Sequence, residues 1–311
     1  MKEVRLETRI EAALLIAAVA LPFILQALGE DYYIGFATRL LIFALAATGL
    51  NFIVGYGGMV AFGHAAFFGI GAYAVALLMN AGMISAWITW PVAIVAAALA
   101  ATLIGALSLR TRGVYFIMIT LAFAQMIYYS VISLNFAGGD DGLPLAQRST
   151  LAPLDLANDA TLYWVTLALL AICLMALKRL AASRYGRALT GLRQNETRME
   201  ALGYPVQRIK LVCFVVGSAV AGLAGALLAN QNGMASPSQL YWTQSGMLLV
   251  MVIMGGVGLR FGGMLGAIVL LGLEEILGRV TEHSHFYVGL ALLAIVLFAP
   301  RGLAGLWARQ K

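Results

Sequence analysis

The sequence predicts an all-α, polytopic integral membrane protein with about ten transmembrane helices, at least one of them discontinuous. Hydrophobic residues make up 62% of the 311 residues and charged residues only 11%, whereas soluble domains carry roughly 25% charged residues. The apolar residues come in runs of about 20, which is the length of a helix that crosses a bilayer. The stretch "GYGGMVAFGHAAFFGIGAY" (55–73) contains six glycines, and its "GYGG" start favours a break in the helix.

The candidate spans follow one another along the whole chain. The first, 10–28, follows a charged N-terminus and superficially resembles a secretory signal. Its apolar run is too long and lacks a convincing cleavage site, so we expect an uncleaved first span and one membrane domain over 1–311. The other nine spans are 35–54, 58–79, 86–109, 113–134, 161–180, 211–230, 240–258, 262–280 and 285–300.

The positive charges fall on alternate sides of these spans. With the N-terminus inside, 17 of the 20 Lys and Arg residues lie in inside segments, Arg148 and Arg279 lie outside, and Arg39 lies within a span. Cytoplasmic loops retain positive charge, so both termini are expected in the cytoplasm. The net charge of +6 is therefore explained by the basic cytoplasmic segments of a protein that is surrounded by membrane lipid. Without interleaved aromatic residues it does not predict a nucleic-acid partner.

Two loops are long enough to do more than connect spans. The outside loop 135–160 is acidic and rich in Gly, Pro, Asp and Asn, so we expect turns on an extracytoplasmic face. The inside segment 178–210 is basic and contains good helix formers, with Gly203 and Pro205 as stop signals. This segment is expected to form a short amphipathic cytoplasmic helix or a pair of helices.

Glycines and sparse polar residues mark a candidate translocation path. The glycines of 55–73 have three interpretations, namely close helix packing, a helix break or a ligand path. His64 is either a polar contact between helices or a functional group. Polar groups in spans avoid lipid, so they face other helices or a polar passage. The candidate path residues are Asn51, Gly55, Gly57, Gly58, His64 and Gln125.

Two further patterns have mainly structural interpretations. In "GSAVAGLAGALLA" the small residues Gly217, Ala221 and Gly225 recur every four positions, which predicts tight helix packing. A second glycine-rich stretch, 255–266, is weakly similar to 55–73. Two such membrane stretches often resemble each other by chance, so we assign no repeat.

Acidic residues inside a confident span occur only at Glu274 and Glu275. A bare carboxylate in the bilayer is costly, and Arg279 follows Glu275 by four residues, the favourable order for a helical ion pair. We expect either a structural ion pair or a gate near the outer mouth.

No enzyme motif is present in the sequence. It contains no G-x-x-x-x-G-K-[ST], H-E-x-x-H or G-x-S-x-G pattern. We therefore assign no catalytic residue, metal site or cofactor, and any ATP must be bound by another chain. Cys173 and Cys213 lie in apolar runs without metal-ligand spacing and are expected to be small buried residues.

Several segments of the chain form a recognisable series. They are "LNFIVGYGGMVAFGHAAFFGIGAYAVALL", "LSLRTRGVYFIMITLAFAQMIYY" with "AGGDDGL", "GRALTGLRQNETRMEALGYPVQRIKLVCFVVGSAVAGLAGAL", and "MVIMGGVGLRFGGMLGA" with "FAPRGLAGL". Together they resemble the LivM-type permease subunit of branched-chain amino acid ABC importers. The resemblance runs in order from about 38 to 306. It implies a subunit in the bacterial inner membrane that works with a second, LivH-like permease, two cytoplasmic ATPase subunits and a periplasmic binding protein.

The resemblance also assigns the cytoplasmic segment to ATPase coupling. "MEALG" stands for the Glu-Ala-Ala-x-x-x-Gly loop of bacterial importers, although its glycine comes early and the later Ile-x-Leu-Pro is missing. Two alternatives stay open: an ABC permease for urea, amides or other small polar solutes, and a stand-alone secondary transporter, which would need ion-coupling carboxylates deep in the membrane. The implied coupling residues are Gly186, Arg187, Arg193, Glu200, Ala201 and Gly203.

Overall fold

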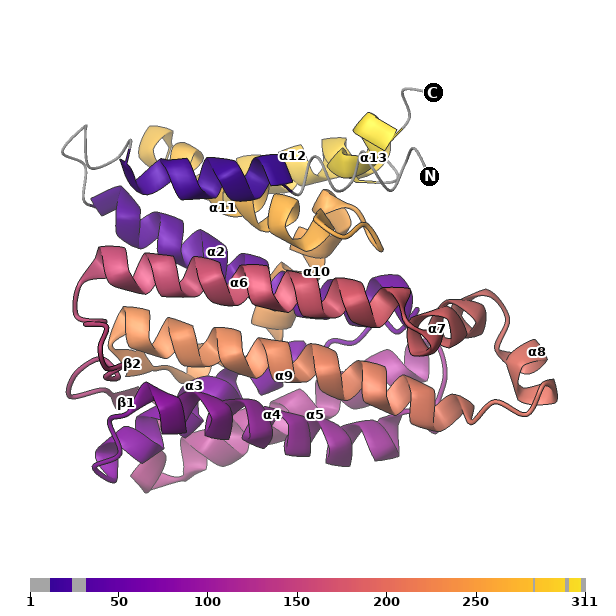
Figure 1. The fold of residues 1–311 in the computed structure, drawn as a ribbon, viewed down its shortest axis with the longest axis horizontal. Coiled ribbons are helices and arrows are strands. Elements are labelled where there is room, and N and C mark those ends of the chain that lie inside the picture. Colours follow the sequence, from indigo (N-terminus) through magenta and orange to yellow (C-terminus); the bar gives the residue numbers. More distant parts are fainter. Residues whose placement is uncertain (1–11, 24–31, 282, 300–301, 309–311) are drawn as a thin grey trace.

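The computed structural model describes residues 12–23, 32–281, 283–299 and 302–308, and this part of the chain is almost entirely helical (Figure 1). A helix over Ala12–Phe23 comes first. The helices that follow are α2 (Tyr32–Asn51) with its π-helical continuation η1 (Phe52–Tyr56), α3 (His64–Asn80), α4 (Ala86–Ser108), α5 (Val114–Ser133), α6 (Asp159–Ala182), α7 (Arg184–Gln194), α8 (Glu196–Ala201), α9 (Val206–Asn232), α10 (Trp242–Gly255), α11 (Gly262–Val280), α12 (Ser284–Phe298) and α13 (Leu303–Ala308).

Each of the ten predicted spans contains a helix, and the all-α membrane fold class is confirmed. For the first span the structure describes only 12–23. Among the described residues, five helices are each long and apolar enough to cross a membrane alone. Others are shorter: α3 has 17 residues, α10 has 14 and α12 has 15. The five long spans are Tyr33–Tyr56, Ala86–Ser108, Val114–Ser133, Asp159–Ala182 and Val206–Asn232.

The predicted span 58–79 differs from the structure at its start. Residues 57–63 form a turn and irregular backbone, and α3 begins only at His64. Gly58 has φ +67°, a left-handed conformation that a side chain disfavours and glycine tolerates. The expected discontinuity is therefore present, and it lies between η1 and α3.

The described segments among those predicted to be cytoplasmic meet at one end of the helix bundle, which we call the α7–α8 end (Figure 1). Arg112, in the α4–α5 turn, forms ion pairs with Glu196 and Glu200 of α8. In α13, Ala304 packs with Phe261, from the α10–α11 turn. Chain segments far apart in sequence thus converge where most of the Lys and Arg residues lie.

Helix α9 is packed tightly by its small residues. A Cβ atom added to Gly217 would overlap the Gly49 carbonyl and the Ile53 side chain, and one added to Gly225 would overlap the Phe68 carbonyl. Helices α2 and α3 therefore touch α9 almost backbone to backbone, where van der Waals contact replaces the hydrophobic effect that is missing in lipid. The packing interpretation of this glycine pattern is confirmed.

The opposite end, the β1–β2 end, is closed by the predicted loop 135–160. The loop contains a 3₁₀ turn (Asn135–Ala137) and strand β1 (Leu143–Pro144), which pairs antiparallel with β2 (Met234–Ala235). Helix η3 (Pro237–Gln239) follows β2. Turns were expected here, but the pairing with residues about 90 positions away was not, because a two-residue strand leaves no periodic signal.

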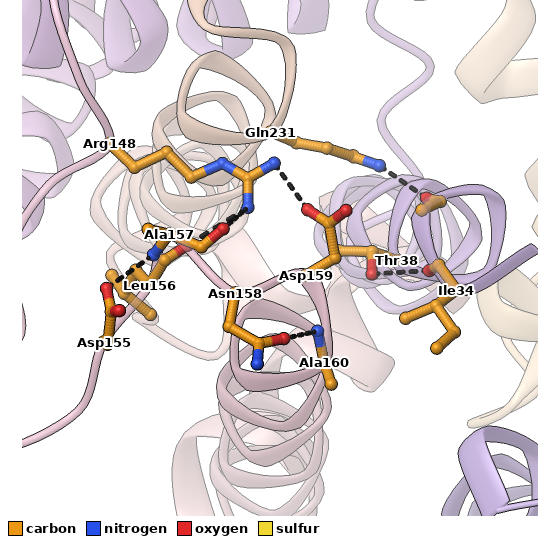
Figure 2. Close-up of polar contacts among 11 residues, drawn as sticks. Ile34, Thr38, Arg148, Asp155, Leu156, Ala157, Asn158, Asp159, Ala160 and Gln231 are labelled. Atoms are coloured by element: carbon orange, nitrogen blue, oxygen red, sulfur yellow. Dashed lines mark hydrogen bonds and ion pairs between the residues drawn. The ribbon is translucent and has the colours of Figure 1, made fainter. Parts of the chain in front are cut away.

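Polar contacts hold this loop together at the start of α6 (Figure 2). Arg148 forms an ion pair with Asp159 at 2.6 Å and donates to the carbonyls of Leu156 and Ala157, each at 3.1 Å. Beside it, Gln231 at the end of α9 donates to the Gly35 carbonyl of α2 at 2.5 Å. Arg148 thus serves as an internal tie of the loop.

The cysteines carry no metal framework. Cys213 is fully buried, as expected, whereas Cys173 is only half-buried. Within the described residues, no group of three or more His, Cys, Asp or Glu side chains is arranged to hold a metal ion.

Candidate functional site

The helix break after η1 is held by a buried asparagine. Asn51, 2% exposed, donates from Nδ2 to the Leu259 carbonyl at 2.6 Å and accepts from the Gly258 N–H at 2.9 Å. Its side chain therefore satisfies one donor and one acceptor in a segment more than 200 residues away. Asn51, a candidate path residue, has the geometry of a clamp between two chain segments.

The segment that Asn51 holds is a second glycine-rich break, at 256–261 between α10 and α11. Gly258 has φ +82° and lies against Gly55, where an added Cβ atom would stand 2.5 Å from the Gly258 nitrogen. Side chains are thus excluded at the point where the two breaks meet. The weak similarity between 55–73 and 255–266 reflects two interruptions that pack together, whatever their evolutionary relation.

Arg193 connects this junction to the segment expected to couple to an ATPase. From the last turn of α7, its guanidinium donates from Nη1 to the Gly55 carbonyl, and its side chain lies against Gly58. The carbonyls at a helix C-terminus lack intrahelical donors and attract cations. Arg193 therefore caps the end of the α2–η1 helix.

The α7–α8 segment is a pair of helices, which is one of the two forms expected from the sequence. The Ser183 hydroxyl accepts from the Gly186 N–H at 3.3 Å, and the Asn195 side chain accepts from the Arg198 N–H at 2.9 Å, so each helix begins at an N-cap. Tyr185 donates to the Ile209 carbonyl at 2.7 Å, which ties α7 to the first turn of α9. Burial raises the pKa of Tyr185 above its usual value, so the phenol stays a neutral donor.

Helix α8 is held by an ion-pair network and buries none of its residues. Glu196 lies 2.7 Å from Lys210 of α9 and 3.3 Å from Arg112, and Glu200 lies 3.0 Å from the same Arg112. The Gly203 N–H donates to the Glu200 carbonyl at 2.9 Å where the helix ends. This network fixes an otherwise exposed helix against the bundle.

Of the other three predicted coupling residues, two have local contacts and one is exposed. Gly186 packs so closely on Ala181 that an added Cβ atom would overlap its backbone, and Arg187 donates to the Ala182 carbonyl at 3.2 Å. Ala201 is exposed. The six predicted coupling residues are therefore divided between the start of α7, the helix break and the exposed α8.

A cavity of about 600 Å³ opens between the helix break and the α7–α8 segment. Its wall contains three charged side chains, two glycines of the break and six aliphatic residues. The lining residues are Val54, Gly57, Gly58, Val60, Leu192, Arg193, Glu196, Lys210, Leu249, Ile253 and Val257.

Not all predicted path residues border this cavity. Gly57 and Gly58 line it, and Asn51 and Gly55 form the junction behind it. His64 is fully buried at the start of α3, where its ring packs edge-on against Phe67 with centroids 6.4 Å apart. Gln125 is half-buried on α5, and its amide nitrogen has no hydrogen-bond partner among the described residues.

The acidic residues of α11 lie at the β1–β2 end. Arg279 contacts Glu275 at 2.8 Å through Nη2 and at 3.1 Å through Nε, and it donates to the Tyr33 hydroxyl at 2.6 Å. This links the end of α11 to the start of α2. Glu274 precedes the pair on α11 and has a partner of its own.

Sequence reasoning missed several residues of the site. Gly258 and Leu259, which Asn51 binds, were visible only as part of a glycine-rich stretch. Lys210 counted as one of many inside charges, and nothing in its spacing to Glu196 indicated a pair. Ser245 of α10 accepts from the Ala65 N–H at 2.8 Å and caps α3, a contact across 180 residues.

The comparisons with known proteins agree with this architecture. The family described as branched-chain amino acid transport system / permease component matches residues 32–299. The high-affinity branched-chain amino acid transport system permease protein LivM of Escherichia coli (strain K12) is 31% identical over 94% of this chain and 73% of its own length. The corresponding LivM protein of Salmonella typhimurium is 30% identical over the same shares. No solved structure matches.

More distant relatives have the same kind of role. LivH of Escherichia coli (strain K12), another permease protein of the high-affinity branched-chain amino acid system, is 25% identical over 85% of this chain and 91% of its own length. The autoinducer 2 import system permease protein LsrC of Escherichia coli (strain K12 / DH10B) is 29% identical over 56% of this chain and 52% of its own length. These relatives are permeases and not enzymes.

The helical bundle shows a multi-pass membrane protein, and the family match identifies it as a permease of the ABC class. The chain belongs to the family of branched-chain amino acid transport system permease components, as its match over 32–299 shows.

Proposed function

We propose that this chain is one of two membrane-spanning subunits of an importer that moves branched-chain amino acids across the bacterial inner membrane. Its partners are a LivH-like permease subunit, two cytoplasmic ATPase subunits and a periplasmic binding protein. The α7–α8 end faces the cytoplasm, because cytoplasmic segments retain positive charge. The distribution of Lys and Arg along the sequence assigns both termini to the same compartment. The β1–β2 end faces the periplasm and receives the binding protein.

The contact of Arg193 with the Gly55 carbonyl carries the proposal. The helix that follows Arg193, α8, has no buried residue and offers Ala201 and Glu200 to a groove on an ATPase. Movement of this helix pair is transmitted through α7 to Arg193, and from there to the helix break. Rigid helices that shift against one another are a known means of such switching.

The helix break forms the inner part of the translocation path. Gly57 and Gly58 present backbone rather than side chains to the cavity, and membrane transporters use interrupted helices in this way. Asn51 and Gly55 hold the break in place, whereas His64 and Gln125 belong to the path deeper in the bundle. At the periplasmic end, the Glu275–Arg279 pair with Glu274 forms an outer gate contact.

The test of coupling is Ala201→Trp in the importer reconstituted with its partners. Ala201 is exposed and has no polar side chain, so the bulky residue changes only the docking surface. We expect the subunit to insert and assemble, while substrate-stimulated ATP hydrolysis and leucine uptake fall at least tenfold. Ala106→Trp, at an exposed alanine of α4, is the matched control and should leave both activities near wild type. Wild-type stimulation in Ala201→Trp would refute the coupling assignment.

Competition separates the alternatives in the same preparation. Excess isoleucine or valine should inhibit leucine uptake, and urea or acetamide should not. Uptake that needs an ion gradient but no ATPase subunits would identify a secondary transporter instead. That alternative would require carboxylates deep in the bilayer, whereas Glu275 lies near the end of α11 and is paired with Arg279.

A further inference from the structure

The cavity beside the helix break combines charges of both signs with an aliphatic wall. Its charged side chains come from three elements, namely Arg193 at the end of α7, Glu196 at the start of α8 and Lys210 in the first turns of α9. Two cations and one carboxylate leave the lining with a net positive charge. A volume of about 600 Å³ lies within the range of small-molecule sites.

The positive groups retain donors for a carboxylate. Arg193 uses Nη1 for the Gly55 carbonyl, and the planar guanidinium has further N–H groups directed elsewhere. The Lys210 side chain is only 15% exposed, and it approaches Glu196 at 2.7 Å through one of its three ammonium donors. Partial burial strengthens the attraction of Lys210 for an anion.

The negative groups lie within the same cavity. Glu196, 24% exposed, is an acceptor, and the end of the α2–η1 helix at Gly57 and Gly58 adds the partial negative charge of its terminal carbonyls. An ammonium group can therefore be accommodated beside the carboxylate site. Glu196 also contacts Lys210 at 2.7 Å and Arg112 at 3.3 Å, so a bound ammonium group would share this carboxylate with them. A simple anion would contact only the cations and would not use these acceptors.

The remaining wall is apolar; half of its six aliphatic residues come from α10 and the turn after it, and Leu192 of α7 is another. Leu249 and Ile253 of α10 are followed by Val257, and Val54 and Val60 flank the break. These are branched aliphatic side chains without polar atoms. They suit a small branched hydrocarbon group, which gains free energy by leaving water.

We propose that this cavity is a cytoplasmic exit site that holds the zwitterion of a branched aliphatic α-amino acid before its release. The carboxylate lies toward Arg193 and Lys210, the ammonium toward Glu196 and the break, and the side chain against the α10 wall. The inference rests on the proposed function, and it adds a defined site on this chain. Because a cavity of about 600 Å³ is larger than one amino acid, the ligand does not fill it and binding is weak, on the order of millimolar.

The test uses the complete importer in nanodiscs, where both faces are accessible. A thiol introduced by Val257→Cys reports on the cavity wall through its rate of reaction with a water-soluble maleimide. Leucine should slow this reaction, and about 1 mM leucine should halve its rate. At equal concentration, 4-methylpentanoate lacks the ammonium group, 3-methylbutylamine lacks the carboxylate and glycine lacks the aliphatic chain, so each should protect at least tenfold less well.

Variants assign the protection to the charged wall. Lys210→Gln and Glu196→Gln, each combined with Val257→Cys, should raise the half-protecting leucine concentration about tenfold. Arg198→Gln is the matched control, since Arg198 is an exposed charge of α8 that does not line the cavity, and it should cause no change. Gln207→Cys, an exposed thiol position outside the cavity, should show no protection by leucine.

The outcomes distinguish this site from the importer function. ATP-driven leucine uptake by the unsubstituted importer supports the proposed function whatever the cavity does. Absence of leucine protection, or equal protection by all four compounds, overturns the exit site alone. A Val257→Cys thiol that does not react in the assembled importer means that a partner subunit fills the cavity, which also overturns it. Loss of uptake with protection intact would count against the importer assignment and not against the site.

Discussion

Replacing Asn51 with leucine removes the clamp between the two helix breaks while conserving side-chain size. Asn51 makes two hydrogen bonds to the backbone of 258–259, at 2.6 and 2.9 Å, and it is 2% exposed. Leucine has nearly the same shape and is apolar, so the substitution tests the polar contacts and not the packing. We expect the 256–261 turn to separate from Gly55 more often.

The size of the effect follows from the groups left without partners. Each lost hydrogen bond costs about 0.5–1.5 kcal/mol net, and a buried donor or acceptor left unsatisfied costs about 1–3 kcal/mol. Gly258 and Leu259 are half-buried, so water satisfies part of their need. The lower end of both ranges applies, and we expect about 2 kcal/mol for opening the turn. This corresponds to a roughly 30-fold change in the opening equilibrium.

Amide hydrogen exchange at Gly258 measures that equilibrium directly. The Gly258 N–H loses its acceptor in Asn51→Leu and should exchange about 30-fold faster. Asn80→Leu is the control, because Asn80 is the exposed last residue of α3. Exchange at Gly258 within about threefold of wild type, or an equal change in Asn80→Leu, would show that Asn51 does not hold the two breaks together.

Three further predictions concern the two ends and the core. Arg148→Ala removes an ion pair and two hydrogen bonds from the β1–β2 end; proteinase K should cleave 135–160 about tenfold faster, corresponding to a loss of about 1.4 kcal/mol, and unchanged cleavage would contradict the role of Arg148. Gly225→Leu drives a side chain into the Phe68 carbonyl, so folded subunit should be lost from the membrane on immunoblots, whereas normal levels would show that α9 can move away from α3. Asp140 and Arg198 are both exposed. A thiol introduced by Asp140→Cys should react with an impermeant reagent added from the periplasm, whereas one introduced by Arg198→Cys should react only after lysis. Reversed labelling would invert the proposed topology.

The sequence by itself determined the fold class, the order of the spans and the position of the first helix break. Apolar runs and glycine clusters are local properties of the sequence. A transmembrane helix forms its backbone hydrogen bonds within its own segment, and a continuous apolar surface is stable in contact with lipid. The helix pair at 178–210 was equally readable, because its caps and stop signals lie within a few residues of the helices. The family resemblance rested on such local segments taken in order.

Only the tertiary structure decided which residues meet. Asn51 and Gly258 are separated by 207 positions, Arg193 and Gly55 by 138, and Ala65 and Ser245 by 180. The periodicity of the sequence does not predict such pairings. They depend on how the helices cross and on where a helix break leaves backbone N–H and C=O groups without hydrogen-bond partners. The same reason separates the predicted path residues: Gly57 and Gly58 reach the cavity through the break, whereas His64 is directed into the core by the helix that begins there.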